Sequence, residues 1–341
     1  MKKFSYRYLC MYLTAATLLF IGGWFGHSLY EQQRDRAKSR RARLVGYFFT
    51  SPLLDVELPE GIVIGREPIP FKHKINAFVQ KQLDTKQVSK LGVYYRDLHD
   101  GPWFGINAKE ALYPASMMKV PIMIAWLKRA EHNPRELKHT YTYDGANDRT
   151  AVQLIKPENK LIPGRSYTVD ELLVQMMTYS DNNAAFILHS KLETSELNAV
   201  IDGMDINNEP DIPDNLLSLH AYSGFFRILY NAAFLNREMS EKALGLLSLQ
   251  DFPQGIVGGV PKGTPVASKF GEHVEGRNEE EKHLHEFGIV YHPKYPYILG
   301  IMTRGHDFNK QAEIIREISR MIYAAVDADI SIEKNTMQGT P

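Results

Sequence analysis

Strand-like segments lie at both ends of the folded part of this chain, and a long block with helical spacing separates them. Before the block, residues 91–106 alternate in the manner of a β-hairpin. After it, strands are expected at 265–270, 286–292 and 297–303. Because strands from both ends must pair to bury their apolar faces, this order predicts one antiparallel sheet with a helical lobe inserted between its strands.

Amphipathic helices are expected within the block and on either side of the strands. Apolar residues recur at helical spacing in 75–83 and in 310–326, so a first and a closing helix should cover the sheet. Inside the block the same spacing predicts helices at 119–130, 169–178, 183–192, 195–201, 221–235 and 240–249.

Composition limits the classes of protein to consider. Of the 341 residues, 44% are hydrophobic, which suffices for one large core or for two sub-domains that share an interface. Forty basic residues balance forty acidic ones. The charge therefore gives no reason to expect nucleic acid as a partner.

The N-terminal part is expected to tether the folded domain to a membrane. Residues 8–30 contain no Lys, Arg, Asp or Glu and are long enough to span a bilayer. A signal peptide would be removed at a small-residue cleavage site, and this segment matches such a site poorly. A retained anchor over 1–30 is therefore preferred to a removed signal peptide. The remaining organisation is a charged stalk and proline-rich linker, one folded domain and a polar tail, at 31–70, 71–326 and 327–341.

A serine and a lysine one helical turn apart, Ser116 and Lys119, lie where a loop becomes a strongly apolar helix. Residues i and i+3 share a helix face, so the lysine amine can approach the serine hydroxyl. Partial burial favours a neutral amine, which can accept the hydroxyl proton. The pair alone is weak evidence, because Ser331 and Lys334 repeat it in the polar tail. A helix cap beside a surface lysine is the simpler explanation for the pair taken by itself.

Two further polar groups follow in the chain. Ser180-Asp181-Asn182 precedes an expected helix, and as a fully specified tripeptide it is rarer by chance than a spaced pair. Ser180 or Asp181 can also cap that helix, which is compatible with a chemical role. Lys269-Phe270-Gly271, followed by Glu272, lies at the end of an expected strand and combines a positive charge with room for close backbone approach. The alternative is an ordinary strand end with a solvated lysine.

Several histidines cluster farther along the chain. His283, His285 and Glu286 alternate along an expected strand, and His273 and His292 lie nearby. Both a metal site and a polar strand edge fit this pattern, and the polar edge is preferred.

In this order and with these surroundings, the three polar groups resemble the motifs of class A β-lactamases and penicillin-binding serine hydrolases. The resemblance covers residues 71–326. It implies an α/β (α+β) fold of the β-lactamase/DD-peptidase type, in which helices flank a five-stranded antiparallel sheet beside an all-helical lobe. The site would lie in the cleft between sheet and lobe, with neither a metal nor a cofactor.

The resemblance also implies roles for individual residues. Ser116 would be acylated, with Lys119 as the base and Ser180 passing the proton toward the leaving group. Substrate would be bound by Asn182, Lys269, Gly271 and Glu272, and the backbone N–H groups of Ser116 and Glu272 would form an oxyanion hole. Phe270 departs from the pattern, because relatives usually carry a Thr or Ser there whose hydroxyl helps to bind a carboxylate.

The step that would release the acyl group is less well matched. Class A β-lactamases carry a water-activating Glu in an E-x-x-L-N sequence, and the corresponding stretch here, 205–216, looks shortened. Glu209 is the nearest candidate for deacylation, but Pro213 occupies the place of the expected Asn. Solvated loop charges are the simpler interpretation of Glu209, Asp211 and Asp214.

The sequence thus predicts a serine hydrolase acylated by a β-lactam or by a D-Ala-D-Ala-type cell-wall peptide, with deacylation left open. The alternative is a catalytically weak or inactive domain that keeps the fold and binds the cell wall or acts as a scaffold. The substrate class favours an extracytoplasmic domain. Six basic residues between positions 34 and 43 argue the other way under the positive-inside rule.

Overall fold

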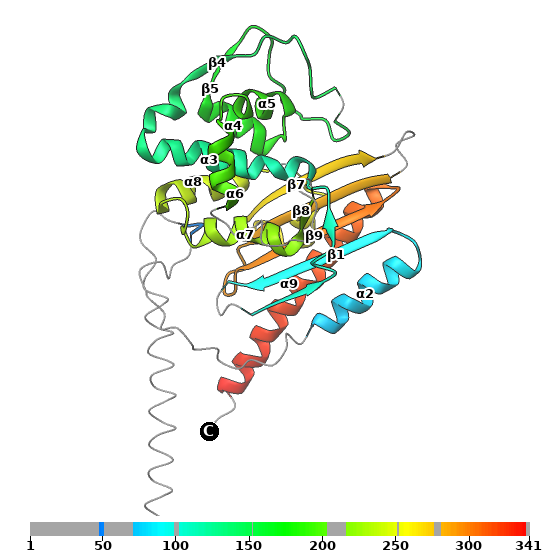
Figure 1. Ribbon diagram of the computed structural model, residues 1–341. Helices are drawn as coiled ribbons and strands as arrows, with labels where there is room; N and C mark the ends of the chain where they lie inside the picture. Colours follow the sequence, from blue (N-terminus) through cyan, green and yellow to red (C-terminus); the bar gives the residue numbers. More distant parts are fainter. Residues whose placement is uncertain are drawn as a thin grey trace, which may run out of the picture.

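The computed structural model describes residues 48–50, 71–98, 102–151, 153–202, 216–250, 252–275 and 281–338, with side chains described up to residue 328. The predicted hairpin and the three later strands form one antiparallel sheet with the strand order β2-β1-β9-β8-β7 (Figure 1). The strands are β1 (Lys90–Asp97), β2 (Trp103–Ile106), β7 (Val266–Glu275), β8 (Glu281–Val290) and β9 (Tyr297–Gly305).

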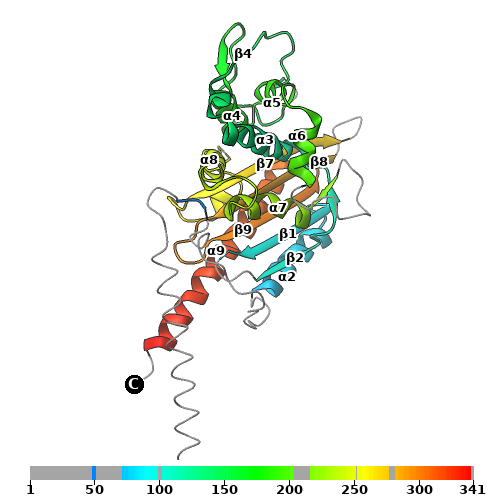
Figure 2. The ribbon, with the colours of Figure 1, turned by 60° about the vertical axis from the view of Figure 1, so that its left-hand side comes forward.

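The two halves of the sheet join where β1 pairs with β9, with Val93 opposite Ile301. The sheet therefore combines strands from both ends of the domain, as the order of the sequence predicts. Strand β7 lies at one edge, next to the helical lobe (Figure 2). Short strand pairs elsewhere are β3 (Ala111–Leu112) with β6 (Leu217–Ser218) and β4 (Thr140–Thr142) with β5 (Ser166–Thr168).

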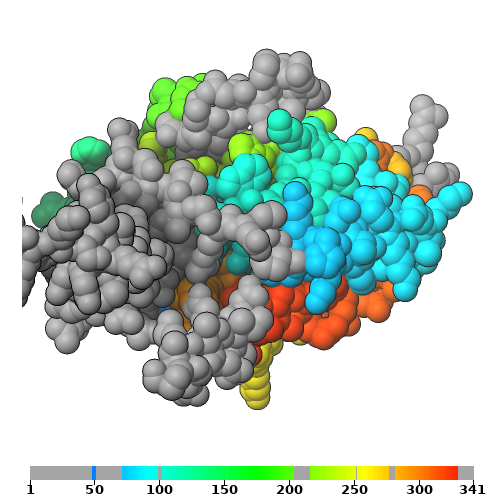
Figure 3. Space-filling view, turned by 90° about the horizontal axis from the view of Figure 1, so that it is seen from below, coloured from blue at the N-terminus to red at the C-terminus, as the bar shows by residue number. Residues whose placement is uncertain are grey.

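Helices cover both faces of the sheet. The face away from the lobe carries α2 (Lys72–Asp84) and α9 (Phe308–Gln338), which lie next to each other when the molecule is seen from below (Figure 3). The opposite face packs against α7 (Leu219–Tyr230) and α8 (Arg237–Leu247). Alternate residues of each strand therefore enter two separate apolar cores.

The helical lobe is built around one buried helix. Helix α3 (Lys119–His132) is buried at every position from Lys119 to Leu127, which identifies it as a central helix rather than a surface one. A capping box between Thr168 and Glu171 starts the next helix. The lobe also contains the 3-10 helices η1 (Ala115–Met118) and η2 (Pro134–Lys138) and the helices α4 (Val169–Thr178), α5 (Asn182–His189) and α6 (Thr194–Asp202).

Several expected boundaries differ from those observed. Strand β7 continues to Glu275 because it pairs with β8 along its whole length, so Lys269-Phe270-Gly271 lies inside the strand and not at its end. Helix α9 continues to Gln338, into the segment expected to be a polar tail. Neither Gly nor Pro occurs between 308 and 338 to end that helix.

Two expectations concern residues outside the described ranges, namely the apolar segment 8–30 and the deacylation candidate Glu209. Among the helices that the structure describes, none is both long and apolar enough to cross a bilayer.

Candidate active site

Ser116 lies in η1, immediately before the buried helix α3. The preceding residue, Ala115, has a left-handed φ of 50°, and Ser180 has one of 55°. A left-handed backbone costs a non-glycine residue about 1–2 kcal/mol, and such strain concentrates at functional sites. One of the two strained residues directly precedes the predicted site residue Ser116, and the other is the predicted site residue Ser180.

Lys119 brings the first two polar groups of the sequence together. Its Nζ lies 3.0 Å from Ser116 Oγ and 3.0 Å from Ser180 Oγ. It also donates to Ser180 O at 2.6 Å and to Asn182 Oδ1 at 2.7 Å. An ammonium has three N–H donors, but four oxygens surround this nitrogen. A neutral amine can instead accept the Ser116 proton while it donates to two of the other oxygens.

Burial makes the neutral form of Lys119 accessible. The residue is only 5% exposed, and desolvation lowers its pKa to about 7, against the opposing influence of Asp181 and Glu272. A sizeable fraction of the amine is therefore unprotonated near neutral pH.

This pKa leads to a testable pH profile. If Lys119 is the base, the acylation rate of Ser116 should be low below pH 6, rise through about pH 7 and level off above it, because only the deprotonated amine can accept the hydroxyl proton. Stopped-flow measurement of acylation between pH 5 and 10 checks this. A rate that keeps rising to pH 10 would indicate an ordinary lysine and contradict the assignment.

The Ser180-Asp181-Asn182 segment is held in place on several sides. The Asp181 carboxylate caps α5 by accepting from Asn183 N and Ala184 N at 2.7 and 2.9 Å. Gln153 bonds to the same segment, donating to Ser180 O at 3.0 Å and accepting from Asn182 N at 3.2 Å. Capping and site formation thus occur together, and Asp181 is the residue that caps.

Lys269 is a buried residue whose amine contacts Ser180. Its Nζ donates to Ser180 Oγ at 3.0 Å and to Phe270 O at 2.8 Å, and the side chain is fully buried. Burial, and next the proximity of Lys119, hold its pKa well below the usual value. The alternative expectation for Lys269, a solvated lysine at an ordinary strand end, is therefore wrong. Ser180 Oγ lies within 3.0 Å of two lysine amines.

The Phe270 side chain belongs to the core on the other face of the sheet. Its ring stacks on Phe252, with 4.5 Å between the ring centroids. Its backbone N–H donates to Gln250 Oε1 at 2.7 Å, off the free edge of β7. Because N–H groups alternate in direction along a strand, the N–H of Glu272 points off that same free edge.

Gly271 lets this edge approach η1. A Cβ on Gly271 would lie 2.8 Å from Pro114 O and 3.1 Å from Met117 N. The close approach places the N–H of Glu272 on the strand that faces the segment containing Ser116. This is the arrangement that an oxyanion hole made by the backbone N–H groups of these two residues requires.

The Glu272 side chain reaches across to the lobe. Its Oε1 accepts from Leu154 N and Ile155 N at 2.9 Å, and its Oε2 also accepts from Ile155 N at 2.9 Å. Burial raises the pKa of this carboxyl, although the two backbone donors oppose the shift. The sequence singled out Glu272 for its backbone, and this contact of its side chain was not expected.

Sequence reasoning assigned no positioning role to three residues that hold the site, although it named His285 among the clustered histidines. Gln153 bridges to Ser180 and Asn182, as described above. The buried Tyr222 hydroxyl donates to Met117 O at 2.8 Å, in the turn that carries Ser116. His285 Nε2 lies 3.1 Å from Tyr113 O, and Thr303 N donates to His285 Nδ1 at 3.1 Å, so Nε2 carries the proton. All three contacts join segments far apart in the chain, and no local sequence pattern marks them.

The clustered histidines have separate structural partners. Burial lowers the pKa of His285 to about 3, so it remains neutral. His283 contacts the Glu275 carboxylate at 3.3 Å, while Glu286 is fully buried and accepts from Ser268 Oγ and Ile256 N. The described residues contain no group of three His, Cys, Asp or Glu side chains placed to hold a metal ion.

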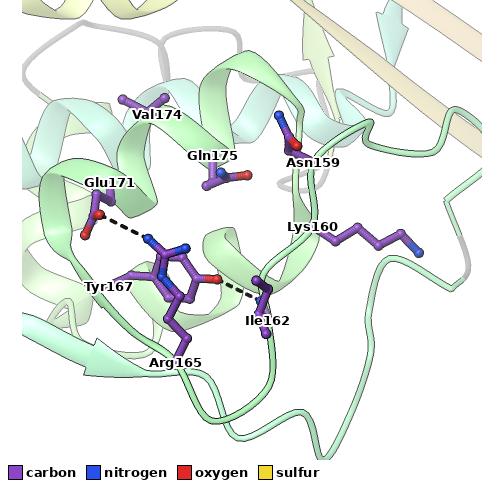
Figure 4. Close-up of a pocket in the computed structure, with 8 residues that line it drawn as sticks. All are labelled: Asn159, Lys160, Ile162, Arg165, Tyr167, Glu171, Val174 and Gln175. Atoms are coloured by element: carbon purple, nitrogen blue, oxygen red, sulfur yellow. Dashed lines mark hydrogen bonds and ion pairs between the residues drawn. The ribbon is translucent and has the colours of Figure 1, made fainter.

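A cavity of about 280 Å³ lies elsewhere, on the helical lobe (Figure 4). Arg165 lies between Glu171, 3.7 Å away, and the ring of Tyr167, whose hydroxyl accepts from Ile162 N at 2.8 Å. None of the residues of the three polar groups lines this cavity. This cavity is therefore separate from the group of side chains around Lys119.

The chain is similar to known proteins in sequence and in fold. A model of the beta-lactamase enzyme family matches residues 70–326. No curated protein matches the chain.

Solved structures share the fold at low sequence identity. A β-lactamase from Sphaerobacter thermophilus DSM 20745 has a TM-score of 0.65 at 21% identity, over 76% of this chain and 98% of that one. The class A β-lactamase of the last common ancestor of Gram-negative bacteria has a TM-score of 0.62 at 20% identity, over 74% and 99%. A mutant of PBP-A, as its acyl-enzyme complex with penicillin G, has 0.61 at 22%, over 77% and 100%. These likenesses confirm the predicted fold class.

Proposed function

The chain belongs to the beta-lactamase enzyme family, and from this premise we propose that it is a serine hydrolase whose Ser116 is acylated by a β-lactam or by a D-Ala-D-Ala-type cell-wall amide. One observation carries the proposal. The buried amine of Lys119 lies 3.0 Å from the hydroxyls of both Ser116 and Ser180. An amine so placed can take a proton from one serine and return it through the other.

In the first half of the reaction, Ser116 Oγ attacks the amide carbonyl carbon and its proton passes to Lys119 Nζ. The carbonyl oxygen becomes an oxyanion, which the backbone N–H groups of Ser116 and Glu272 would stabilise. In the second half, the C–N bond breaks as Ser180 Oγ gives its proton to the leaving nitrogen, and Lys119 returns the proton to Ser180. The Lys269 amine, 3.0 Å from Ser180 Oγ, supports this transfer.

Release of the acyl group requires a water molecule and a base. Glu209 is the nearest candidate for this base, on sequence position alone. The rate of this step decides whether the protein destroys β-lactams or is inhibited by them.

Labelling with a fluorescent penicillin tests the proposal. The intact protein should gain the mass of one penicillin on Ser116, and Ser116→Ala should gain none, because the attacking hydroxyl is gone. Mass spectrometry of the whole protein and of its peptides provides the measurement. A wild type that neither labels nor hydrolyses the penicillin, or equal labelling of the variant, would contradict acylation and leave the non-catalytic cell-wall-binding domain as the better explanation.

The location is part of the same proposal. We place the folded domain outside the cytoplasm, anchored through residues 8–30, because cell-wall amides lie there and the segment is long and apolar enough to span a bilayer. A penicillin probe that does not cross membranes should label the protein in intact cells. Labelling only after lysis would contradict this placement.

A further inference from the structure

We propose that the Glu272 carboxylate determines which acyl donors enter this site. It latches residues 153–155, called the strap below, across the acylation centre, and it disfavours donors that present a carboxylate at the free edge of β7. This inference rests on the proposed function and concerns its substrate class.

The strap is fastened to the lobe at one end. The Gln153 side chain donates to Ser180 O at 3.0 Å and accepts from Asn182 N at 3.2 Å. Ser180 O is the same oxygen that accepts from Lys119 Nζ at 2.6 Å. The strap therefore begins directly against the groups that surround the catalytic amine.

The other end of the strap is fastened to the sheet. The N–H groups of Leu154 and Ile155 both donate to the Glu272 carboxylate at 2.9 Å. Glu272 follows Gly271, the residue at which β7 comes closest to η1. The strap thus joins the Ser180-Asp181-Asn182 segment to β7, and an acyl donor that pairs with the edge of β7 must displace it or fit beside it.

The charges at the site favour the same conclusion. Lys269 is fully buried and its pKa is well below the usual value, while burial lowers that of Lys119 to about 7. Burial therefore weakens the positive charge that either lysine can offer to a bound anion. Phe270 has no hydroxyl to offer, and Glu272 places a carboxylate at the edge of β7. A donor with its own carboxylate at this edge therefore meets a like charge.

The variant Glu272→Gln separates the charge of this residue from its size. Glutamine keeps the side-chain length and the backbone N–H, and its amide oxygen, with two lone pairs, can still accept from the strap N–H groups. The negative charge and the second acceptor oxygen are lost. Because hydrogen bonds to a charged group are stronger than neutral ones, the strap should open more easily in this variant.

The experiment compares two acyl donors that differ by one negative charge and one methyl group, a fluorescent penicillin with a free carboxylate and its methyl ester. Acylation rate constants at Ser116 are measured for both, and the ratio of acid to ester is the readout. In Glu272→Gln this ratio should rise by about tenfold over wild type. The control is Glu171→Gln, which also removes a carboxylate that accepts a backbone N–H, but at the start of α4. Its ratio should equal that of wild type.

Amide hydrogen exchange tests the latch without any acyl donor. Leu154 and Ile155 should be protected in wild type and should exchange about tenfold faster in Glu272→Gln. Equal exchange in the two proteins overturns the latch.

Each outcome of the labelling bears on a separate claim. An unchanged acid-to-ester ratio in Glu272→Gln, with both probes attached to Ser116, overturns the role of Glu272 and leaves the proposed function standing. Absence of both labelling and penicillin hydrolysis in wild type and in all variants overturns the proposed function and this inference with it.

Discussion

Replacing Lys119 by methionine is expected to slow the acylation of Ser116 by about 10²–10⁴-fold, the usual contribution of a positioned acid or base. Methionine preserves much of the buried volume, but it cannot accept the Ser116 proton. It also removes the Lys119 donor from Asn182 Oδ1 and from Ser180 O, which keeps its bond from Gln153. The rate of penicillin labelling, followed by mass spectrometry, measures the loss.

A lysine on the same helix provides the matched control. Lys128 lies in α3 and binds the Glu131 carboxylate and Phe234 O, away from the three polar groups. Lys128→Met should label at the wild-type rate. Thermal unfolding of both variants shows whether each is folded. A folded Lys119→Met protein that labels within a factor of a few of wild type would remove Lys119 from the mechanism.

Adding one methyl group at Gly271 is expected to lower both stability and acylation. In Gly271→Ala the new Cβ would lie 2.8 Å from Pro114 O and 3.1 Å from Met117 N, and these backbone atoms have no rotamer by which to move aside. Such overpacking costs about 1–3 kcal/mol of unfolding free energy. Displacement of η1 from β7 also separates Ser116 from the N–H of Glu272, so acylation should fall by about 10–100-fold. Denaturant unfolding and penicillin labelling measure the two effects.

A glycine with more room around it serves as the control for this change. Gly245 lies inside α8, and its added Cβ would come no closer than 3.8 Å to Phe49 Cε2. Gly245→Ala should match wild type in labelling and be as stable or up to about 1 kcal/mol more stable, because alanine favours helices. If Gly271→Ala behaved like Gly245→Ala, the close contact between β7 and η1 would have no role in the site.

Much of the fold could be predicted from local patterns. The helix over 169–178 was predicted with both ends correct. The strand expected at 297–303 begins at Tyr297 as predicted and ends two residues later than predicted, at Gly305. These elements have a strong apolar period and clear ends, such as the Thr168 cap. Strand β7 was underestimated, because its second half, from Gly271 to Glu275, carries polar residues that only pairing with β8 holds in the sheet.

The candidate site was predictable to the extent that it lies in short, contiguous groups. Ser116 and Lys119 share one helical turn, so their proximity follows from helix geometry alone. The contact of Lys119 with Ser180 and Asn182, more than 60 positions away, was expected only from the family resemblance. Glu209 could be named from sequence, and its role stays a prediction because it lies outside the described residues.

The amino-acid sequence alone thus identified the serine, the lysine and the family of folds, because these depend on local spacing and on the order of strands and helices. Folding decided how the three polar groups are used. Burial turned Lys119 and Lys269 into amines of lowered pKa, and alternation along β7 directed Phe270 into the core. Folding also brought the Glu272 carboxylate to the backbone N–H groups of Leu154 and Ile155, which donate to it. Such properties depend on desolvation and on contacts between distant segments, which no local pattern of residues encodes.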